Sequence, residues 1–405
     1  MNILCKLLVF VSLVAGLAAA QSSPSSELVL SGGTVYPAPG AKAITDAMVV
    51  IRGGKIVSIE KRHNVQAPRS ATVLDCSGKF IVAGFWNSHV HFTEDAWKEA
   101  ASTPASKLEA HMQEMLTRWG FTTVWDLGSD PQNTLALRKR VEAGEVPGPK
   151  ILMAGDIFPL HGHPVYVPAD IQLPEAATPE DAQRMARGYM YLGLDGIKLF
   201  TGAYMGDKPV INMDTAIVAA AVDIAHALGK PVFAHPQNYA GVDNALAGGV
   251  DILAHTIPDE GHYKPEELAQ MKRQHTALIP TLTLWTTVTP NVEAQKHLVQ
   301  AGVDELKAFA SEGGTILFGT DVGFTTKYDT GEEFEYMGRA MTWIEILASL
   351  TTNPAAFFKA SSKGRVEKDM DADLVVLEGD PVADVKNFAK VAYTVRAGKV
   401  TYQRK

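Results

Sequence analysis

Residues 79–92 read KFIVAGFWNSHVHF, an apolar run that ends in two histidines, His89 and His91. Alternate side chains of a β-strand point to the same face, so both imidazoles are expected to face one point. Two imidazoles at the end of a buried strand make up half of a metal site. The triplet alone is weak evidence, because His-x-His also occurs by chance. The other ligands must come from other strand ends.

The composition bounds the class of protein. The chain has 405 residues, 46% of them hydrophobic, and a net charge of −8, so it can bury a large core in more than one packing unit. This mild acidity argues against nucleic acid or an anionic membrane surface as a partner. We therefore expect a small-molecule partner.

The first twenty residues have the pattern of a signal peptide. A short start containing Lys6 is followed by an apolar run and by three alanines before Gln21. An uncleaved membrane anchor is the alternative reading, but the apolar run is short for a bilayer crossing. We expect an exported protein, periplasmic or secreted, with no membrane attachment after cleavage. Cys76 is then the one cysteine left, and it is expected to be a small buried apolar residue.

Both ends of the chain have β character. Residues 21–81 contain short runs in which apolar and polar residues alternate, separated by glycine. The same pattern occurs at residues 364–405. We expect these two segments to form one small composite β-sandwich beside a central domain at residues 82–363.

The central domain alternates short buried strands with helical patterns. Eight strands over about 280 residues match the size of a (β/α)₈ TIM barrel, which makes the fold class α/β. The second choice is a doubly wound open sheet, but no glycine-rich phosphate loop follows a strand. The expected strands are IVAGFWNSHVH, TTVWDLG, PKILMAGDIF, GIKLFTG, PVFAHP, ILAHT, ALIPTLTLW and TILFGTDVG.

Polar residues occur at the carboxyl ends of these strands, which is where TIM barrels carry their functional groups. A lysine inside the apolar run GIKLF, Lys198, is costly as a cation, so its pKa should fall. A neutral amine can add carbon dioxide and become an anionic carbamate. Each histidine alone is more often a hydrogen-bonded core residue, but coincidence does not readily explain the whole set: His89, His91, Lys198, His235, His255 and Asp321.

With these residues the chain resembles the amidohydrolase superfamily of metal-dependent hydrolases, and in particular its imidazolonepropionase-like group with prolidase- and amidase-type members. The resemblance covers nearly all of the chain after the leader. Residues before the first histidine, FWN, are bulkier than is usual there. The motifs that carry the resemblance are FIVAGFWNSHVHF, LMAGDIFPLHGHP, DGIKLF, ILAHT, FGTDVG and TTNPAAFFKASSKGRVEKDMDADLVVLEGDPVADV.

The resemblance implies a binuclear metal site, commonly zinc, although histidine and carboxylate ligands also suit Mn, Fe or Co. It implies that His89, His91 and Asp321 bind the more buried ion. It implies that His235 and His255 bind the more exposed ion and that carboxylated Lys198 bridges the two. A mononuclear site without Lys198 is the alternative.

The resemblance also implies the reaction, which is hydrolysis of an amide-type C–N bond, in a dipeptide or N-acyl amino acid with a free carboxylate. A metal-bridging hydroxide would attack, and Asp321 would shuttle its proton to the leaving nitrogen. His255 is assigned a second role in orienting the carbonyl. A cyclic-amide, lactone or phosphotriester hydrolase is the alternative, and a non-catalytic metal-binding scaffold is a remote one. The resemblance is also compatible with a homo-oligomer.

Substrate selection is expected from loops. His161 and His163, after the third strand, and Tyr204, after the lysine strand, are the candidates for substrate contacts. Trp285 is expected either in the pocket wall or in the core. The acidic run at residues 332–335 is expected to be a solvated helix face. The remaining histidines are expected to be structural or surface residues.

Overall fold

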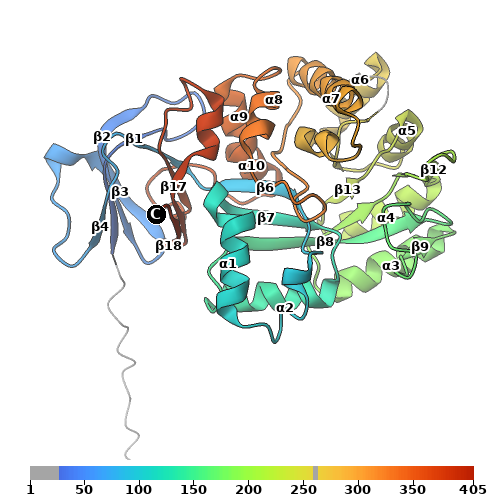
Figure 1. The fold of residues 1–405 in the computed structure, drawn as a ribbon, viewed down its shortest axis with the longest axis horizontal. Helices are drawn as coiled ribbons and strands as arrows, with labels where there is room; N and C mark the ends of the chain where they lie inside the picture. The colour runs from blue at the N-terminus through green and yellow to red at the C-terminus, as the bar shows by residue number, and fades with distance from the viewer. Residues whose placement is uncertain (1–26, 259–262) are drawn as a thin grey trace, which may run out of the picture.

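The structure is a computed structural model that describes residues 27–258 and 263–405. The expected signal peptide at residues 1–20 lies outside the described residues. Figure 1 shows a β-rich part that contains the C-terminus and a larger part in which helices surround strands.

Both ends of the chain contribute to one sheet. The strand order is β18-β17-β16-β5-β1-β2-β3, with β4 paired to β1. The sheet therefore joins the two terminal segments, as the sequence predicts, while their packing as a sandwich stays a prediction. Its strands among the described residues are β1 (Leu28–Val35), β2 (Ile44–Arg52), β3 (Lys55–Lys61), β4 (Thr72–Asp75), β5 (Phe80–Ala83), β16 (Leu374–Leu377), β17 (Val391–Arg396) and β18 (Lys399–Gln403).

The run IVAGFWNSHVH, which is predicted to be one strand, divides into two strands at Gly84. Before it, β5 pairs with β1 and β16 in the terminal sheet. After it, β6 (Phe85–Val90) pairs with β7 (Phe121–Leu127) in the central sheet. A Cβ at Gly84 would lie 2.3 Å from Thr122 Oγ1, so the chain crosses between the sheets at a position with room for a hydrogen only.

The central sheet is parallel and has the order β15-β14-β13-β10-β8-β7-β6. Isolated parallel bridges join Leu278 to Ile316 and Val90 to Val322, so residues 316–322 connect the two edges of this sheet. The remaining strands described in this part are β8 (Lys150–Pro159), β9 (Glu175–Ala176), β10 (Gly196–Leu199), β11 (Gly202–Ala203), β12 (Ile211–Asn212), β13 (Val232–Ala234), β14 (Ile252–Leu253) and β15 (Ala277–Leu278).

The predicted strand ALIPTLTLW is only partly a strand. It stops after β15, because Pro280 cannot donate a ladder hydrogen bond and Thr281 has φ +45°. Residues Leu282–Thr286 instead form a 3₁₀ helix, η4.

Helices follow the strands where the sequence offers capping residues. Asp130, Thr178, Asp214 and Asn291 each accept a backbone N–H in the first turn of the helix that follows. The described helices are α1 (Ala105–Met115), α2 (Pro131–Glu142), α3 (Pro179–Tyr191), α4 (Thr215–Ala227), α5 (Tyr239–Ala247), α6 (Pro265–Gln274), α7 (Val292–Ser311), α8 (Gly331–Met337), α9 (Trp343–Leu350) and α10 (Thr352–Phe357).

The central strands and the terminal sheet have separate hydrophobic clusters, and the first of them lies below the predicted site. Large side chains of the central strands, among them Trp86, Trp125 and Phe233, pack together with Phe358 beneath the strands' carboxyl ends. A separate hydrophobic cluster is formed by residues of the terminal sheet. It includes Cys76, which is buried and not in a disulfide, as predicted. Among the described residues, no helix combines the length and hydrophobicity that a bilayer crossing requires.

Candidate metal centre

The predicted histidine and lysine ligands lie at or just after the carboxyl ends of strands of the central parallel sheet. His89 is in β6, and Lys198 is in β10 beside β13. His235 directly follows β13, and His255 comes two residues after β14. Parallel strands present these ends at one edge of the sheet, so residues far apart in sequence meet there.

The tightest group is His89, His91 and Asp321. Asp321 Oδ1 lies 3.1 Å from His89 Nε2 and 2.9 Å from His91 Nε2, and the two Nε2 atoms are 3.2 Å apart. One potential ligand atom from each residue lies within 4.8 Å of the others. A single cation can therefore be reached by all three side chains.

Two glycines allow the Asp321 segment to approach β6. A Cβ at Gly319 would lie 2.9 Å from His89 Cβ, and one at Gly323 would lie 1.8 Å from the His91 carbonyl oxygen. Between them, Asp321 has φ +59°, and its backbone N–H donates to the His89 carbonyl at 2.8 Å. A non-glycine residue in this region is unusual and is found preferentially at functional sites.

The imidazoles are held by their second nitrogens. His91 Nδ1 lies 3.3 Å from the Gly128 carbonyl, which can only accept, so Nδ1 carries the proton and Nε2 presents a lone pair. His255 Nδ1 lies 2.7 Å from Thr281 Oγ1, whose hydroxyl donates to the Pro280 carbonyl. His255 Nδ1 must then donate, which again leaves Nε2 free.

The histidines of the site are packed against one another. The His255 ring centroid lies 4.7 Å from those of both His89 and His235. Burial, followed by the charges of neighbouring cationic groups, lowers the pKa of His89 and His255 well below the usual value and that of His235 to about 3. For His91, burial lowers the pKa, but the contact with Asp321 and the negative charges of Asp321 and Asp126 together outweigh burial and raise the pKa. Neutral imidazoles are the form that binds metal.

Lys198 is almost fully buried, with 1% of its surface exposed. Its charge lowers the pKa of His89, His235 and His255, which places the amine among them. Burial in turn lowers the pKa of Lys198, against the negative charges of Asp156 and Asp321. This is the direction that the sequence predicts.

Two acids beside the site, the buried Asp126 and the partly buried Asp156, were not predicted from the sequence. Asp126 accepts from Ser129 Oγ at 2.7 Å and from Thr134 Oγ1 at 2.8 Å, which fixes the loop that carries Gly128. Asp156 pairs in register with Lys198, and burial raises its pKa. Each is an acid inside an apolar strand, which is the signal that identified Lys198.

The predicted substrate residues lie in the loops. His161 is exposed, with φ +62°. His163 has ring nitrogens 3.3 Å from the Pro164 carbonyl and 3.1 Å from the Ile171 carbonyl, so its ring holds its own loop. Tyr204 is 42% exposed. The substrate roles of all three stay predictions.

The predicted solvated face at residues 332–335 is wrong for Glu333. This carboxylate is fully buried and accepts the backbone N–H groups of Leu282 and Thr283, at the start of η4. It supplies an acceptor for N–H groups at a helix start, which lack a partner within the helix. Trp285, in η4, is buried and donates to Thr256 Oγ1 at 2.8 Å.

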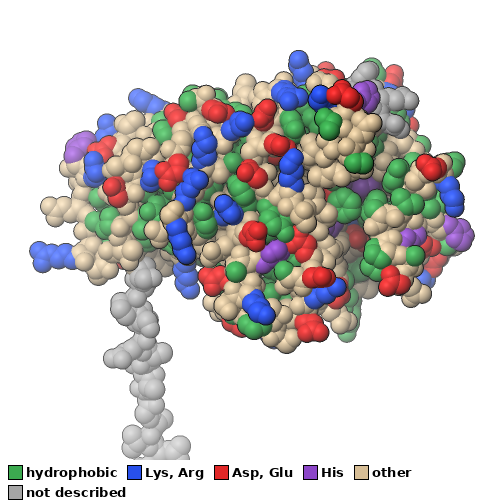
Figure 2. Space-filling model, in the orientation of Figure 1, with side chains coloured by type: hydrophobic (Ala, Val, Ile, Leu, Met, Phe, Trp, Pro, Cys, Tyr) green, Lys and Arg blue, Asp and Glu red, His purple; other side chains and the backbone are tan. Residues whose placement is uncertain are grey.

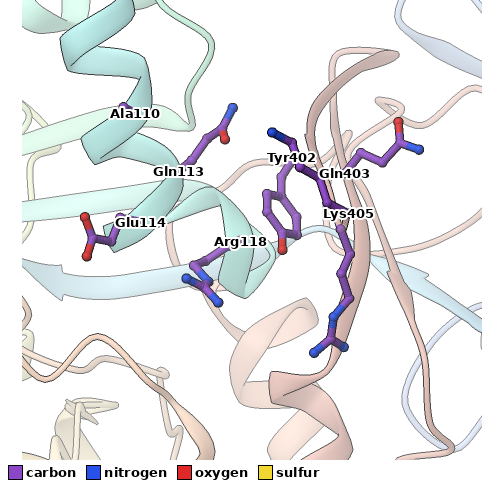
Figure 3. A pocket seen from close by; sticks show the side chains of 8 residues that line it. Ala110, Gln113, Glu114, Arg118, Tyr402, Gln403 and Lys405 are labelled. Carbon is purple, nitrogen blue, oxygen red and sulfur yellow. The ribbon is translucent and has the colours of Figure 1, made fainter.

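The ligand cluster is distinct from a hollow of about 490 Å³ between α1 and the C-terminal strand. Figure 3 shows its lining, which includes Gln113, Arg118 and Tyr402 and no histidine. On the face drawn in Figure 2, histidine atoms are visible inside another hollow, near the place where Figure 1 labels β13.

The sequence model of the Amidohydrolase family matches residues 80–401, which is most of the chain. The chain belongs to the amidohydrolase family. Membership identifies it as a hydrolase that acts on carbon–nitrogen bonds and confirms the resemblance drawn from its motifs.

Curated relatives of this amidohydrolase are distant. It is 23% identical to an ochratoxinase of Aspergillus niger, over 94% of this chain and 88% of that protein. It is 22% identical to an adenine deaminase of Rubrobacter xylanophilus over 95% of this chain, but the match spans only 58% of the deaminase.

Solved structures share the fold of this amidohydrolase. A putative prolidase from Bifidobacterium longum superposes with a TM-score of 0.79 at 24% identity and covers 95% of this chain and 97% of that one. A Xaa-Pro dipeptidase with methionine bound in its active site gives 0.78 at 22% identity, covering 94% and 100%.

The residues of this amidohydrolase fit divalent cations. Among the described residues, His235 Nε2 and Asp321 Oδ1 are buried polar atoms without a hydrogen-bond partner. Such atoms are costly unless something binds them. Imidazole nitrogens beside a carboxylate form a donor set that suits Zn, Mn, Fe or Co.

Proposed function

We propose that this amidohydrolase cleaves the amide bond of dipeptides or N-acyl amino acids at a site for two divalent ions, zinc being the expected metal. His89, His91 and Asp321 would hold one ion and His235 and His255 the other, with N-carboxylated Lys198 between them. The observation that carries the proposal is the convergence of four imidazoles, one carboxylate and one buried lysine at a single sheet edge.

Bound divalent cations supply Lewis acidity and lower the pKa of water. The chain's own groups do the remaining work. Asp321, whose backbone N–H donates to the His89 carbonyl, would take a proton from the attacking water and give it to the leaving nitrogen. His255, fixed by Thr281, would orient the scissile carbonyl. Trp285, buried beside His255 with ring centroids 6.3 Å apart, would help exclude water.

The proposal also covers the domains and location of the mature protein. The mature protein would consist of a composite β-domain at residues 21–81 and 364–405 and a hydrolase barrel at residues 82–363. It would act outside the cytoplasm after loss of residues 1–20, on a small molecule and as a homo-oligomer. A cyclic-amide hydrolase is the second candidate, because an 84-residue stretch is 38% identical to a dihydroorotase of Anaeromyxobacter dehalogenans.

A substrate panel tests the proposal. Protein beginning at Gln21 and loaded with Zn²⁺ would be assayed for amine release from dipeptides and N-acetyl amino acids, and for ring opening of dihydroorotate to its N-carbamoyl product. We expect turnover of acyclic amides and loss of at least a hundredfold in Lys198→Met, which keeps the apolar stem but removes the amine. Lys107→Met, at an exposed position, is the matched control. Wild-type turnover by Lys198→Met would refute the bridging role, and hydrolysis of dihydroorotate alone would favour the second candidate.

A further inference from the structure

Two aromatic side chains from different loops meet close to the ligand cluster. The rings of Tyr166 and Phe324 pack edge to face, with centroids 5.1 Å apart and planes at 73°. Tyr166 nevertheless remains 40% exposed and Phe324 45% exposed. Exposed apolar surface on large rings that are already ordered is typical of a ligand-binding surface.

Phe324 directly follows the turn that contains the proposed metal ligand Asp321. Its backbone N–H lies 3.3 Å from the Asp321 carbonyl, and the preceding Gly323 is pressed against the His91 carbonyl. The position of the Phe324 ring is therefore set by the same turn that sets the Asp321 carboxylate.

Tyr166 reaches the site from the loop after β8. That loop is tied to the segment after Lys198, because Val165 N–H donates to the Tyr204 carbonyl at 3.1 Å. Burial, and then the negative charges of Asp321 and Asp156, raise the pKa of the Tyr166 hydroxyl. The hydroxyl end thus lies within the field of both carboxylates, while part of the residue faces solvent. It has no hydrogen-bond partner among residues 27–258 and 263–405.

We propose that Tyr166 and Phe324 are specificity-determining residues: their rings receive a large apolar or aromatic side chain next to the scissile amide, and the Tyr166 hydroxyl donates a hydrogen bond to the substrate. This rests on the proposed amide hydrolysis and narrows its substrate class. Two further large apolar residues of these loops are exposed: Val165, next to Tyr166 in the chain, by 58%, and Tyr204, whose carbonyl accepts from Val165 N–H, by 42%. A small or hydrophilic substrate would not cover this apolar surface, so burial of the surface would add nothing to the substrate's binding free energy.

Steady-state kinetics on matched dipeptides test the substrate class. For Zn²⁺-loaded protein, we expect kcat/KM for Phe-Ala or Ala-Phe to exceed that for Ala-Ala by about tenfold or more. Phe324→Ala should reduce this ratio to about one. Tyr166→Phe should lower kcat/KM for the aromatic dipeptide while retaining the preference, because the ring remains. Tyr191→Ala, at a residue 92% exposed, is the control and should retain the wild-type ratio.

Calorimetry provides a readout that does not depend on turnover. We expect L-phenylalanine to bind the Zn²⁺-loaded protein about tenfold tighter than L-alanine, and Phe324→Ala to abolish the difference. Equal affinities in the wild type, or an unchanged preference in Phe324→Ala, would overturn the inference. Absence of hydrolysis of both dipeptides and N-acyl amino acids would refute the proposed function instead, and the binding comparison would still decide the role of the ring pair.

Discussion

At the scale of single residues, the site depends on groups that touch the ligands rather than on the ligands alone. Thr281 fixes the tautomer of His255, and the Gly128 carbonyl fixes that of His91. Such partners orient the ring and increase the basicity of the nitrogen that faces the metal.

Thr281→Val should weaken metal binding while leaving the fold intact. The substitution keeps the shape of the side chain and removes the acceptor for His255 Nδ1, so the ring is free to rotate. We expect a loss of about 10- to 100-fold in Zn²⁺ affinity, measured by competition with a chelator. Thr287→Val, whose hydroxyl donates to the Leu284 carbonyl, is the control. An unchanged affinity in Thr281→Val would contradict the role given to this hydroxyl.

At the scale of elements, a buried acid and two glycines hold the segments that carry the ligands. Glu333 anchors η4 next to Thr281, and burial raises its pKa from 4.5 to about 7. Between these values the folded protein holds a proton that the unfolded chain releases. The free energy of unfolding should therefore fall as pH rises through this window, by about 3 kcal/mol for this group.

Glu333→Gln should remove that part of the pH dependence. Chemical denaturation of metal-free protein at pH 5 and pH 8 would measure it. We expect a smaller decline in the variant than in the wild type, whereas Glu335→Gln, at a more exposed carboxylate paired with Lys386, should behave like the wild type. The same decline in Glu333→Gln as in the wild type would show that another group titrates.

Gly323→Ala should destabilise the turn that carries Asp321. The new Cβ would collide with the His91 carbonyl, and the φ of +96° is unfavourable for alanine. We expect a loss of about 3 kcal/mol in unfolding free energy together with weaker metal binding. Gly313→Ala also has positive φ but meets nothing within 4 Å, so it should cost only about 1 kcal/mol. Equal costs for the two variants would rule out the close approach as the cause.

At the scale of the whole molecule, the sequence predicts the connectivity better than the contacts between distant segments. Strand periodicity and glycine punctuation indicate the central strands and the joining of both chain ends in one sheet. The crossing at Gly84 was not predicted, because the apolar pattern continues through it while the space around it is set by Thr122. The burial of Glu333 is not predicted for a similar reason: its partners lie 51 and 50 residues away, and an acidic run is usually solvated.

The metal content of the folded protein tests the central claim most directly. After reconstitution with Zn²⁺ and removal of the excess, inductively coupled plasma mass spectrometry should find about two ions per wild-type chain. The count should be lower in His89→Ala, His235→Ala and Lys198→Met. His226→Ala, at a partly exposed histidine paired with Asp251, should match the wild type. Wild-type metal content in all three ligand variants, or a wild-type chain that retains no metal, would contradict the account.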